Sequence, residues 1–243
     1  MQANCDLPQR EDRPDSEYTG FVGSVLYLAL WTRPDILNTV RHLTRAFAGP
    51  TEAHKAVAKQ LARYLHGTQN NQITYKAGDP MTLEVYSDSD YAGKQNNGRR
   101  STSGMVVMAG GTYISARSHT QTIVAQSTAE AEYIALAEAI KETLWLRQLY
   151  EELELDDGGP VKVRVDNTTA IQIAEAVCQF EKTKHIAVRY HLARHAVTHN
   201  QIQLVYVNTK DNLADKHTKA LDKTTLLRLA SIQSGWQLKR TSD

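Results

Sequence analysis

The sequence has 243 residues and a formal net charge of +1, from 28 Lys and Arg against 27 Asp and Glu, which excludes a strong overall attraction to nucleic acid or membrane. This length allows one large domain or two small ones around a buried core. The two cysteines lack metal-ligand spacing, and no apolar run is long enough to span a bilayer. We therefore expect a soluble, intracellular globular protein with only local electrostatic footprints.

The first part of the chain is predicted to be helical. Residues 1–15 are polar and contain proline, which predicts a disordered tail. In the region 16–69, Pro34 and Pro50 each stand where a first helical turn accepts proline. The region therefore divides into three predicted helices, at about 17–32, 34–47 and 51–66.

Basic residues recur at intervals of four on two of these helices. Arg41 and Arg45 do so on the second helix, and Lys55, Lys59 and Arg63 on the third. Two interpretations remain open: a solvated charged face, or a surface that follows the phosphates of a nucleic acid.

A change in composition marks a domain boundary. The segment 67–80 is rich in Gly, Asn and Gln around a short predicted strand at 73–75. We assign 70–236 to a second domain and 237–243 to a tail.

The second domain has a mixed α/β pattern. Predicted strands are 83–88, 103–109, 112–118, 161–165 and 202–207, and predicted helices are 127–153, 168–176, 187–199 and a stretch from about 211. Gly110-Gly111 predicts a hairpin turn between the second and third strands. Hairpins make the first three strands antiparallel, whereas helical crossovers make the last two parallel to the first. The predicted fold class is α/β, with a five-stranded mixed sheet flanked by helices.

Two aspartates stand at the ends of predicted strands. Asp88 ends the first strand and Asp166 follows the valine-rich strand 161–165. If these strands are parallel neighbours, both carboxylates emerge at the same edge of the sheet, where open α/β sheets place their sites. Taken alone, Asp166 is also a natural N-cap for the helix that follows.

Two further acids are candidates. Ser127 and Glu130 form a capping-box pattern, which gives Glu130 a structural role. Glu132 lies instead on the side of its helix that turns toward the sheet, as a rim residue or a ligand. Asp215 begins the last helical stretch and, taken alone, is a capping or first-turn residue.

Converging carboxylates need a cation. Without one their mutual repulsion raises their pKa values. Mg²⁺ prefers carboxylate oxygens, and two such ions about 4 Å apart can activate water and stabilise a leaving oxygen in phosphodiester cleavage. Spacing alone does not establish that chemistry.

An ordered set of motifs resembles the ribonuclease H domain of copia-type LTR retrotransposons. The motifs are Tyr86-Ser-Asp-Ser-Asp-Tyr-Ala-Gly93, Arg99-Arg-Ser-Thr-Ser-Gly104, Ser127-Thr-Ala-Glu-Ala-Glu-Tyr-Ile-Ala-Leu136, Val165-Asp-Asn167, Thr183-Lys-His-Ile186 with Arg189-Tyr-His191, and Leu213-Ala-Asp-Lys216. The preceding helices resemble the thumb or connection segment that follows a reverse-transcriptase core, including Tyr18-Thr-Gly-Phe-Val-Gly-Ser-Val-Leu-Tyr27, Thr32-Arg-Pro-Asp35 and Pro50-Thr-Glu-Ala-His54.

The resemblance implies a ribonuclease H-like fold and hydrolysis of the RNA strand of RNA/DNA hybrids. The implied ligands of two Mg²⁺ ions, with Mn²⁺ as a substitute, are Asp88, Glu132, Asp166 and Asp215. The implied nucleic-acid contacts are Arg99, Arg100, Ser101, Asn167, Lys184, His185, Arg189 and His191. It further implies the polymerase domain as a partner, no membrane association, and a cytoplasmic location, in virus-like particles if the element is active, or a nuclear one.

The sequence departs from the family in the loop before Asp215. Many cellular ribonucleases H carry a catalytic histidine there, but this loop reads Val205-Tyr-Val-Asn-Thr-Lys210, with Asn208 where copia-type sequences usually have proline. His217 lies on the other side of Asp215 and is a poor substitute. Two alternatives therefore stay open: a catalytically inactive remnant that binds hybrid or other nucleic acid, and a different nuclease or recombinase built on the same sheet.

Overall fold

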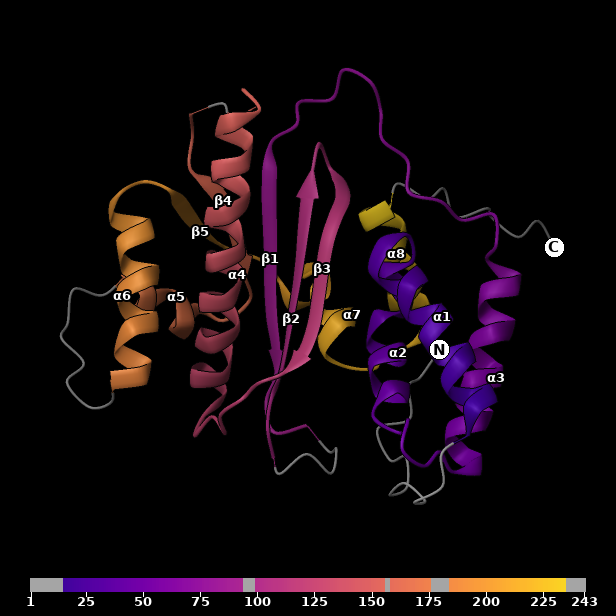
Figure 1. Ribbon diagram of the computed structural model, residues 1–243. Coiled ribbons are helices and arrows are strands. Elements are labelled where there is room, and N and C mark those ends of the chain that lie inside the picture. Colours follow the sequence, from indigo (N-terminus) through magenta and orange to yellow (C-terminus); the bar gives the residue numbers. More distant parts are fainter. Residues whose placement is uncertain (1–14, 94–98, 156–157, 176–183, 235–243) are drawn as a thin grey trace.

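The computed structural model describes residues 15–93, 99–155, 158–175 and 184–234, with only the backbone of 184–190 (Figure 1). The predicted tails at 1–15 and 237–243 lie outside this range, apart from Asp15. None of the helices in the described parts of the chain combines the length and the apolar character needed to cross a bilayer.

The N-terminal segment is helical, as predicted. It consists of α1 (Ser16–Trp31), the 3₁₀ turn η1 (Pro34–Ile36), α2 (Leu37–Thr44) and α3 (Glu52–Gly67). The predicted helix at 34–47 is therefore a 3₁₀ turn followed by a shorter α-helix. Local capping begins two of the helices, since Asp15 Oδ1 accepts from Tyr18 N at 3.0 Å and Thr51 forms a capping box with His54. The helices share an apolar core of their own that includes Val22, Val40 and Leu61.

The second region confirms the predicted five-stranded mixed sheet flanked by helices. Its strands are β1 (Leu83–Asp90), β2 (Thr102–Ala109), β3 (Thr112–Thr120), β4 (Val161–Val165) and β5 (Ile202–Tyr206), in the order β3-β2-β1-β4-β5. The pairs β1·β2 and β2·β3 are antiparallel, and β1·β4 and β4·β5 are parallel.

The strand predicted at 73–75 does not form, so that prediction is wrong. Two isolated hydrogen bonds hold the backbone of Thr74 instead: its N–H donates to Ser234 O at 3.1 Å, and its carbonyl accepts from Thr112 Oγ1 at 3.1 Å. The Ile-Thr-Tyr run has strand propensity but finds no neighbouring strand with which to pair.

Helices cover both faces of the sheet. Successive side chains of β1 point to opposite faces of the sheet, and Val85 points into a core beneath α4 (Thr128–Glu152). Residues of α5 (Thr168–Glu175) and α6 (Lys184–Thr198) contribute to the same core. Tyr86 points to the opposite face, where it packs with Val106 of β2 and Leu229 of α8 (Lys223–Ser234). The 3₁₀ turn η2 (Thr209–Asp211) and α7 (Asp215–Thr218) precede α8, and α7 contacts β1, β2 and β3.

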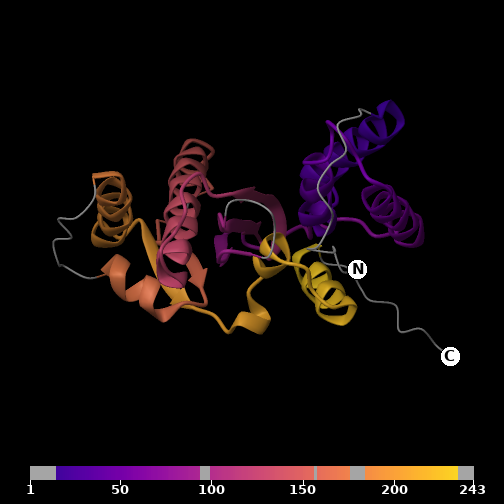
Figure 2. The same cartoon turned by 90° about the horizontal axis from the view of Figure 1, so that it is seen from below.

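The helical segment lies beyond β3, and α6 lies at the other side of the sheet (Figure 2). Helix α2 contacts both β3 and α7, and Tyr113 Oη on β3 donates to Leu30 O in α1 at 3.1 Å. The helical segment is therefore packed directly against the sheet, close to the helix that carries Asp215.

Candidate active site

The ends of two parallel strands bring Asp88 and Asp166 together. In the ladder between β1 and β4, the last pair is Ser87 with Val165, so the next residues, Asp88 and Asp166, lie side by side where this pairing ends. Asp88 does not end its strand as predicted, because β1 continues to Asp90 through its pairing with β2. The prediction that these two strands are parallel neighbours, β1 with β4, is confirmed. Asp88 is buried, with 2% of its surface exposed, whereas Asp166 is partly exposed.

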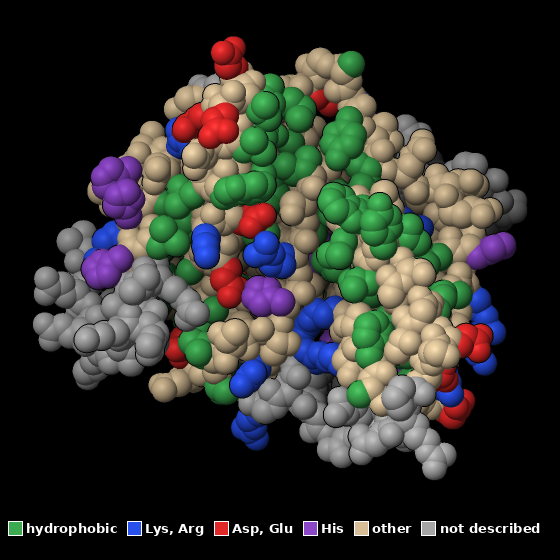
Figure 3. Space-filling model, viewed as in Figure 1, with side chains coloured by type: hydrophobic (Ala, Val, Ile, Leu, Met, Phe, Trp, Pro, Cys, Tyr) green, Lys and Arg blue, Asp and Glu red, His purple; other side chains and the backbone are tan. Residues whose placement is uncertain are grey.

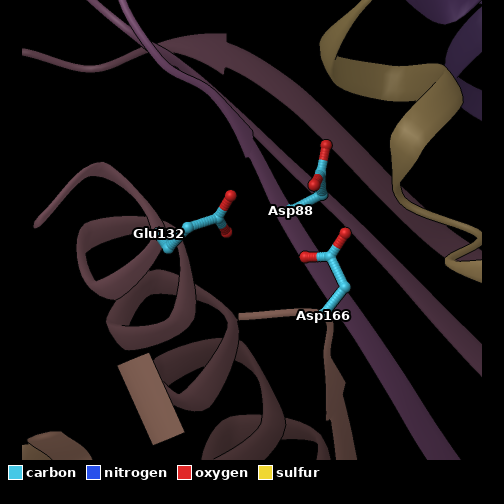
Figure 4. Close-up of side chains that lie close together, drawn as sticks. All are labelled: Asp88, Glu132 and Asp166. Carbon is cyan, nitrogen blue, oxygen red and sulfur yellow. The ribbon is translucent and has the colours of Figure 1, made fainter. Parts of the chain in front are cut away.

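Helix α4 adds Glu132. Ser127 Oγ accepts from Glu130 N at 3.1 Å and begins the helix, while Glu130 Oε2 accepts from Gln126 N at 2.6 Å. Glu130 therefore has the structural role predicted for it, although its side chain bonds one residue earlier than in a full capping box. Glu132 is buried and points toward the two aspartates (Figure 4).

These three side chains form a compact acidic cluster. Asp88, Glu132 and Asp166 each place a carboxylate oxygen so that all three atoms lie within 4.8 Å of one another. Burial, with the charges of Asp88 and Asp166, raises the pKa of Glu132 to about 9. Burial and the charge of Asp215 raise the pKa of Asp88. Without a cation, the cluster therefore holds protons near neutral pH.

The cluster fits a hard divalent cation. Glu132 Oε2 is buried and has no hydrogen-bond partner among the described residues, which is a costly arrangement for a carboxylate unless a cation binds there. The donor set consists only of carboxylate oxygens, which Mg²⁺ and Mn²⁺ prefer over the nitrogen and sulfur ligands of zinc sites.

Asp215 lies beside this cluster and is paired with a lysine. It is the first residue of α7, is buried, and places Oδ1 2.5 Å from Lys219 Nζ. Desolvation alone would lower the pKa of Lys219, but the carboxylates of Asp88, Asp215 and Asp166 outweigh it and raise that pKa. The ammonium group therefore supplies positive charge at the edge of the acidic site.

Helix α7 is fixed to β1 by two polar contacts. Thr218 Oγ1 donates a short hydrogen bond to Asp88 Oδ2. Just before the helix, Asn212 is fully buried and its Nδ2 donates to Ser87 O at 3.0 Å. The two bonds tie Asp215 to the strand that carries Asp88.

Gly104 makes this close approach possible. It faces Asp88 across the β1·β2 ladder, and α7 lies on top of it. A Cβ atom at this position would lie 2.5 Å from Thr218 Cγ2, 3.0 Å from Ala214 O and 3.2 Å from His217 Cβ. Any larger residue would have to displace the helix that holds Asp215.

Comparisons with known proteins identify the relatives of this chain. No model of a known protein family matches it. The retrovirus-related Pol polyprotein from transposon RE1 of Arabidopsis thaliana is 38% identical over 216 residues, which cover 89% of this chain and 15% of that polyprotein. The Pol polyprotein from transposon TNT 1-94 of Nicotiana tabacum is 37% identical over 206 residues, 85% of this chain and 15% of the polyprotein. This chain is a homologue of copia-type transposon Pol polyproteins.

The Pol homologue spans about 15% of the length of the curated relatives that it matches. Among solved structures, LC11-RNase H1 in complex with an RNA/DNA hybrid is 18% identical, aligned over 56% of this chain and 94% of that chain with a TM-score of 0.42.

The residues predicted to contact nucleic acid take different roles in this Pol homologue. Arg99 and Arg100 are exposed in the loop before β2. Ser101 is completely buried, and its Oγ accepts from Ala92 N at 3.2 Å, so it holds the loop and does not face solvent. Asn167 Oδ1 accepts from Ala170 N at 3.0 Å. The alternative assignment of Asp166 as the cap of α5 is therefore wrong, because Asn167 caps that helix.

The predicted basic patch near residue 185 is only partly described. The side chains of Lys184, His185 and Arg189 lie outside the described residues, whereas His191 is exposed on α6. His217 is fully buried, and burial lowers its pKa well below the usual range. It is therefore not placed to replace the missing loop histidine.

Sequence reasoning missed four residues around the acids: Gly104, Asn212, Thr218 and Lys219. Gly104 ends the motif that begins at Arg99, and Asn212 precedes the motif that begins at Leu213. The motifs therefore marked both positions, but the sequence offered no physical reason why these residue types are needed there. The signal for Lys219 was its place four residues after Asp215, which allows an ion pair on one helical turn.

Proposed function

We propose that this Pol homologue is a metal-dependent nuclease that hydrolyses the RNA strand of RNA/DNA hybrids during retroelement reverse transcription. The observation that carries the proposal is the convergence of Asp88, Glu132 and Asp166 at one edge of the sheet, with Glu132 Oε2 buried and unpartnered among the described residues. Its relation to transposon Pol polyproteins supports the same class of activity.

The three clustered acids would hold a divalent cation, Mg²⁺ or Mn²⁺. Asp215, tied to Asp88 through α7, would be the fourth ligand of a two-ion site. The cations would activate the attacking water and stabilise the leaving oxygen of the RNA phosphodiester. The chain's own part is positioning: Gly104 and Asn212 bring α7 against β1, and Lys219 balances charge beside Asp215.

The substrate would be recognised outside the acidic cluster. Arg99 and Arg100 are exposed at the same end of the sheet and suit contacts to phosphates. Discrimination of RNA from DNA would use the 2′-hydroxyl and the shape of the hybrid. The helical region 16–69 would be the remnant of the polymerase that packs against the nuclease, and the protein would act where reverse transcription takes place, in the cytoplasm or in virus-like particles.

One observation favours a second candidate, a remnant that binds hybrid without cleaving it. Lys219 Nζ lies against Asp215, so Asp215 would have to break this ion pair before it could bind a cation as the fourth ligand. His217 is buried and is not available as a catalytic histidine. Under this alternative, binding would remain and cleavage would be absent.

The test is cleavage of a labelled RNA/DNA hybrid in Mg²⁺, beside single-stranded RNA and duplex DNA. Asp88→Asn and Asp166→Asn remove cluster ligands. Asp211→Asn is the matched control, because Asp211 is an exposed acid outside the cluster that pairs with Arg228 at 2.9 Å. We expect hybrid-only cleavage that both cluster variants abolish and the control keeps. Binding without cleavage in Mg²⁺ and Mn²⁺ would support the inactive remnant, and cleavage of duplex DNA would refute the hybrid specificity.

A further inference from the structure

Two arginines of the helical segment reach the edge of the sheet beside the acidic cluster. Arg41 Nη2 on α2 donates to Thr102 Oγ1 at 3.2 Å and to Thr120 Oγ1 at 3.0 Å. Arg45 Nη2, one turn later, donates a short hydrogen bond to the same Thr120 hydroxyl. A group of Lys and Arg side chains is visible where the sheet meets the helical segment (Figure 3).

The strand register fixes where these arginines lie relative to the acids. Asp90, Thr102 and Thr120 form one row across β1, β2 and β3. The neighbouring row on the same face begins with Asp88. Because successive residues on one face of a strand are two positions apart, the two rows are separated by roughly 7 Å.

The arrangement brings two positive charges close together. The two guanidinium groups converge on one hydroxyl, and desolvation together with the charge of Arg45 lowers the pKa of Arg41, an effect that Asp90 partly offsets. Arg41 Nη1 is buried without a hydrogen-bond partner among the described residues. A buried guanidinium donor without a partner is costly, and an anion bound beside it would satisfy that donor.

Two other basic residues of the helical segment are paired with nearby acids. Arg33 forms a bidentate pair with Asp35, at 2.9 and 2.8 Å. Lys55 Nζ lies 3.0 Å from Asp15 Oδ2 and 3.3 Å from Glu52 Oε1. Of the two basic lines in the sequence, the one on α2 borders the acidic cluster, because α2 contacts β3 and α7.

We propose that Arg41 and Arg45 bind the phosphodiester backbone of the hybrid, next to the phosphate that is cleaved. The proposal rests on the proposed function, because it assumes a hybrid lying across the acidic cluster. Thr120 lies one row along and two strands across from Asp88, which places it roughly 12 Å from that acid. A duplex carries one phosphate per about 3.4 Å of axis in each strand, so the patch lies within a few nucleotides of the cleavage position. Arg100, two residues before Thr102 and exposed, extends this track. The helical segment thereby forms part of the substrate-binding site, in addition to packing against the sheet.

The experiment measures binding separately from cleavage. Fluorescence anisotropy of a labelled RNA/DNA hybrid is followed in EDTA across a range of salt concentrations, for the whole chain and for Arg41→Gln, Arg45→Gln and Arg45→Lys. Lys59→Gln is the control, because Lys59 is exposed on α3 at the same helical spacing but away from the sheet. Thermal unfolding of each variant separates loss of structure from loss of binding.

Each Gln variant should lower the slope of log K against log salt by about 1 and weaken binding roughly tenfold near 0.1 M salt, since one phosphate contact is lost. Arg45→Lys and Lys59→Gln should keep the wild-type slope. A folded Arg45→Gln variant with the wild-type slope would overturn the inference and leave the nuclease proposal intact. Equal losses in Lys59→Gln would also overturn it. Absence of hybrid binding by the unmodified chain would overturn both proposals.

Discussion

Replacing Gly104 by alanine tests how the site is assembled. The added Cβ would lie 2.5 Å from Thr218 Cγ2 and 3.0 Å from the carbonyl oxygen of Ala214. The first contact is with a methyl group and the second with the backbone of the residue before Asp215. Helix α7 must therefore move away from β1 to admit the methyl group.

The expected cost follows from these contacts. Overpacking of this kind costs about 1 to 3 kcal/mol in free energy of unfolding, equivalent to a fall in Tm of roughly 2 to 12 °C for a chain of this size. Displacement of α7 also weakens the hydrogen bond from Thr218 to Asp88 and shifts Asp215. A misplacement of about 1 Å in a catalytic group can lower turnover roughly 100-fold, so activity should fall further than stability.

The assay is a double-mutant cycle read by thermal unfolding and hybrid cleavage. Thr218→Ser removes Cγ2 but keeps the hydroxyl that donates to Asp88, so it should recover part of the stability and activity lost in Gly104→Ala. The coupling should be about 0.5 kcal/mol or more. Gly23→Ala is the matched control: beyond its own helix turn, no atom of the described residues lies within 4 Å of the added Cβ, and alanine in a helix should stabilise by up to about 1 kcal/mol.

Two results would refute this reasoning. One is a Gly104→Ala variant with unchanged Tm and cleavage, which would mean that α7 does not lie on the glycine. The other is additive loss in the double variant, which would show that Thr218 is not the group that the methyl displaces.

Three further predictions concern the same site. In metal-free buffer the free energy of unfolding should fall as pH rises from about 4.5 to about 9. The reason is that the raised pKa of Glu132 lets the folded protein keep a proton that the unfolded chain releases. In thermal unfolding, the Tm of Glu132→Gln should change less with pH than the Tm of the unmodified chain. Asn212→Ala should lower the free energy of unfolding by about 1 to 3 kcal/mol, measured by urea denaturation, because it leaves the buried carbonyl of Ser87 without its donor. Lys219→Met should tighten Mg²⁺ binding several-fold in a calorimetric titration, because it removes a positive charge from beside Asp215; unchanged affinity would contradict the pairing.

The sequence was enough to predict the sheet and the meeting of Asp88 with Asp166. Strand alternation identifies the two strands, and a helical crossover between them makes them parallel, so residues at their ends share an edge. Glu132 could be distinguished from Glu130 because helical periodicity separates the face toward the sheet from the capping position. These inferences depend on local patterns that hold before any tertiary contact is known.

The remaining features depend on contacts between distant parts of the chain. The need for glycine at 104 comes from α7, which lies far later in the sequence and packs on the opposite side of the ladder from α4. The burial of Ser101 and the choice of Asn167 over Asp166 as a cap depend on how each loop closes, which side-chain type alone does not determine. The 73–75 segment shows the same limit, since strand propensity forms no strand without a pairing partner.

The measurement that most directly tests the central claim compares Glu132→Gln with Glu130→Gln in the hybrid-cleavage assay with Mg²⁺. The two glutamates lie on the first turns of the same helix, but only Glu132 joins the acidic cluster, whereas Glu130 bonds to Gln126 N. We predict that Glu132→Gln abolishes cleavage while the protein remains folded, and that Glu130→Gln cleaves the hybrid with at most a modest loss of stability. Cleavage retained by Glu132→Gln would contradict a cation site built on this cluster.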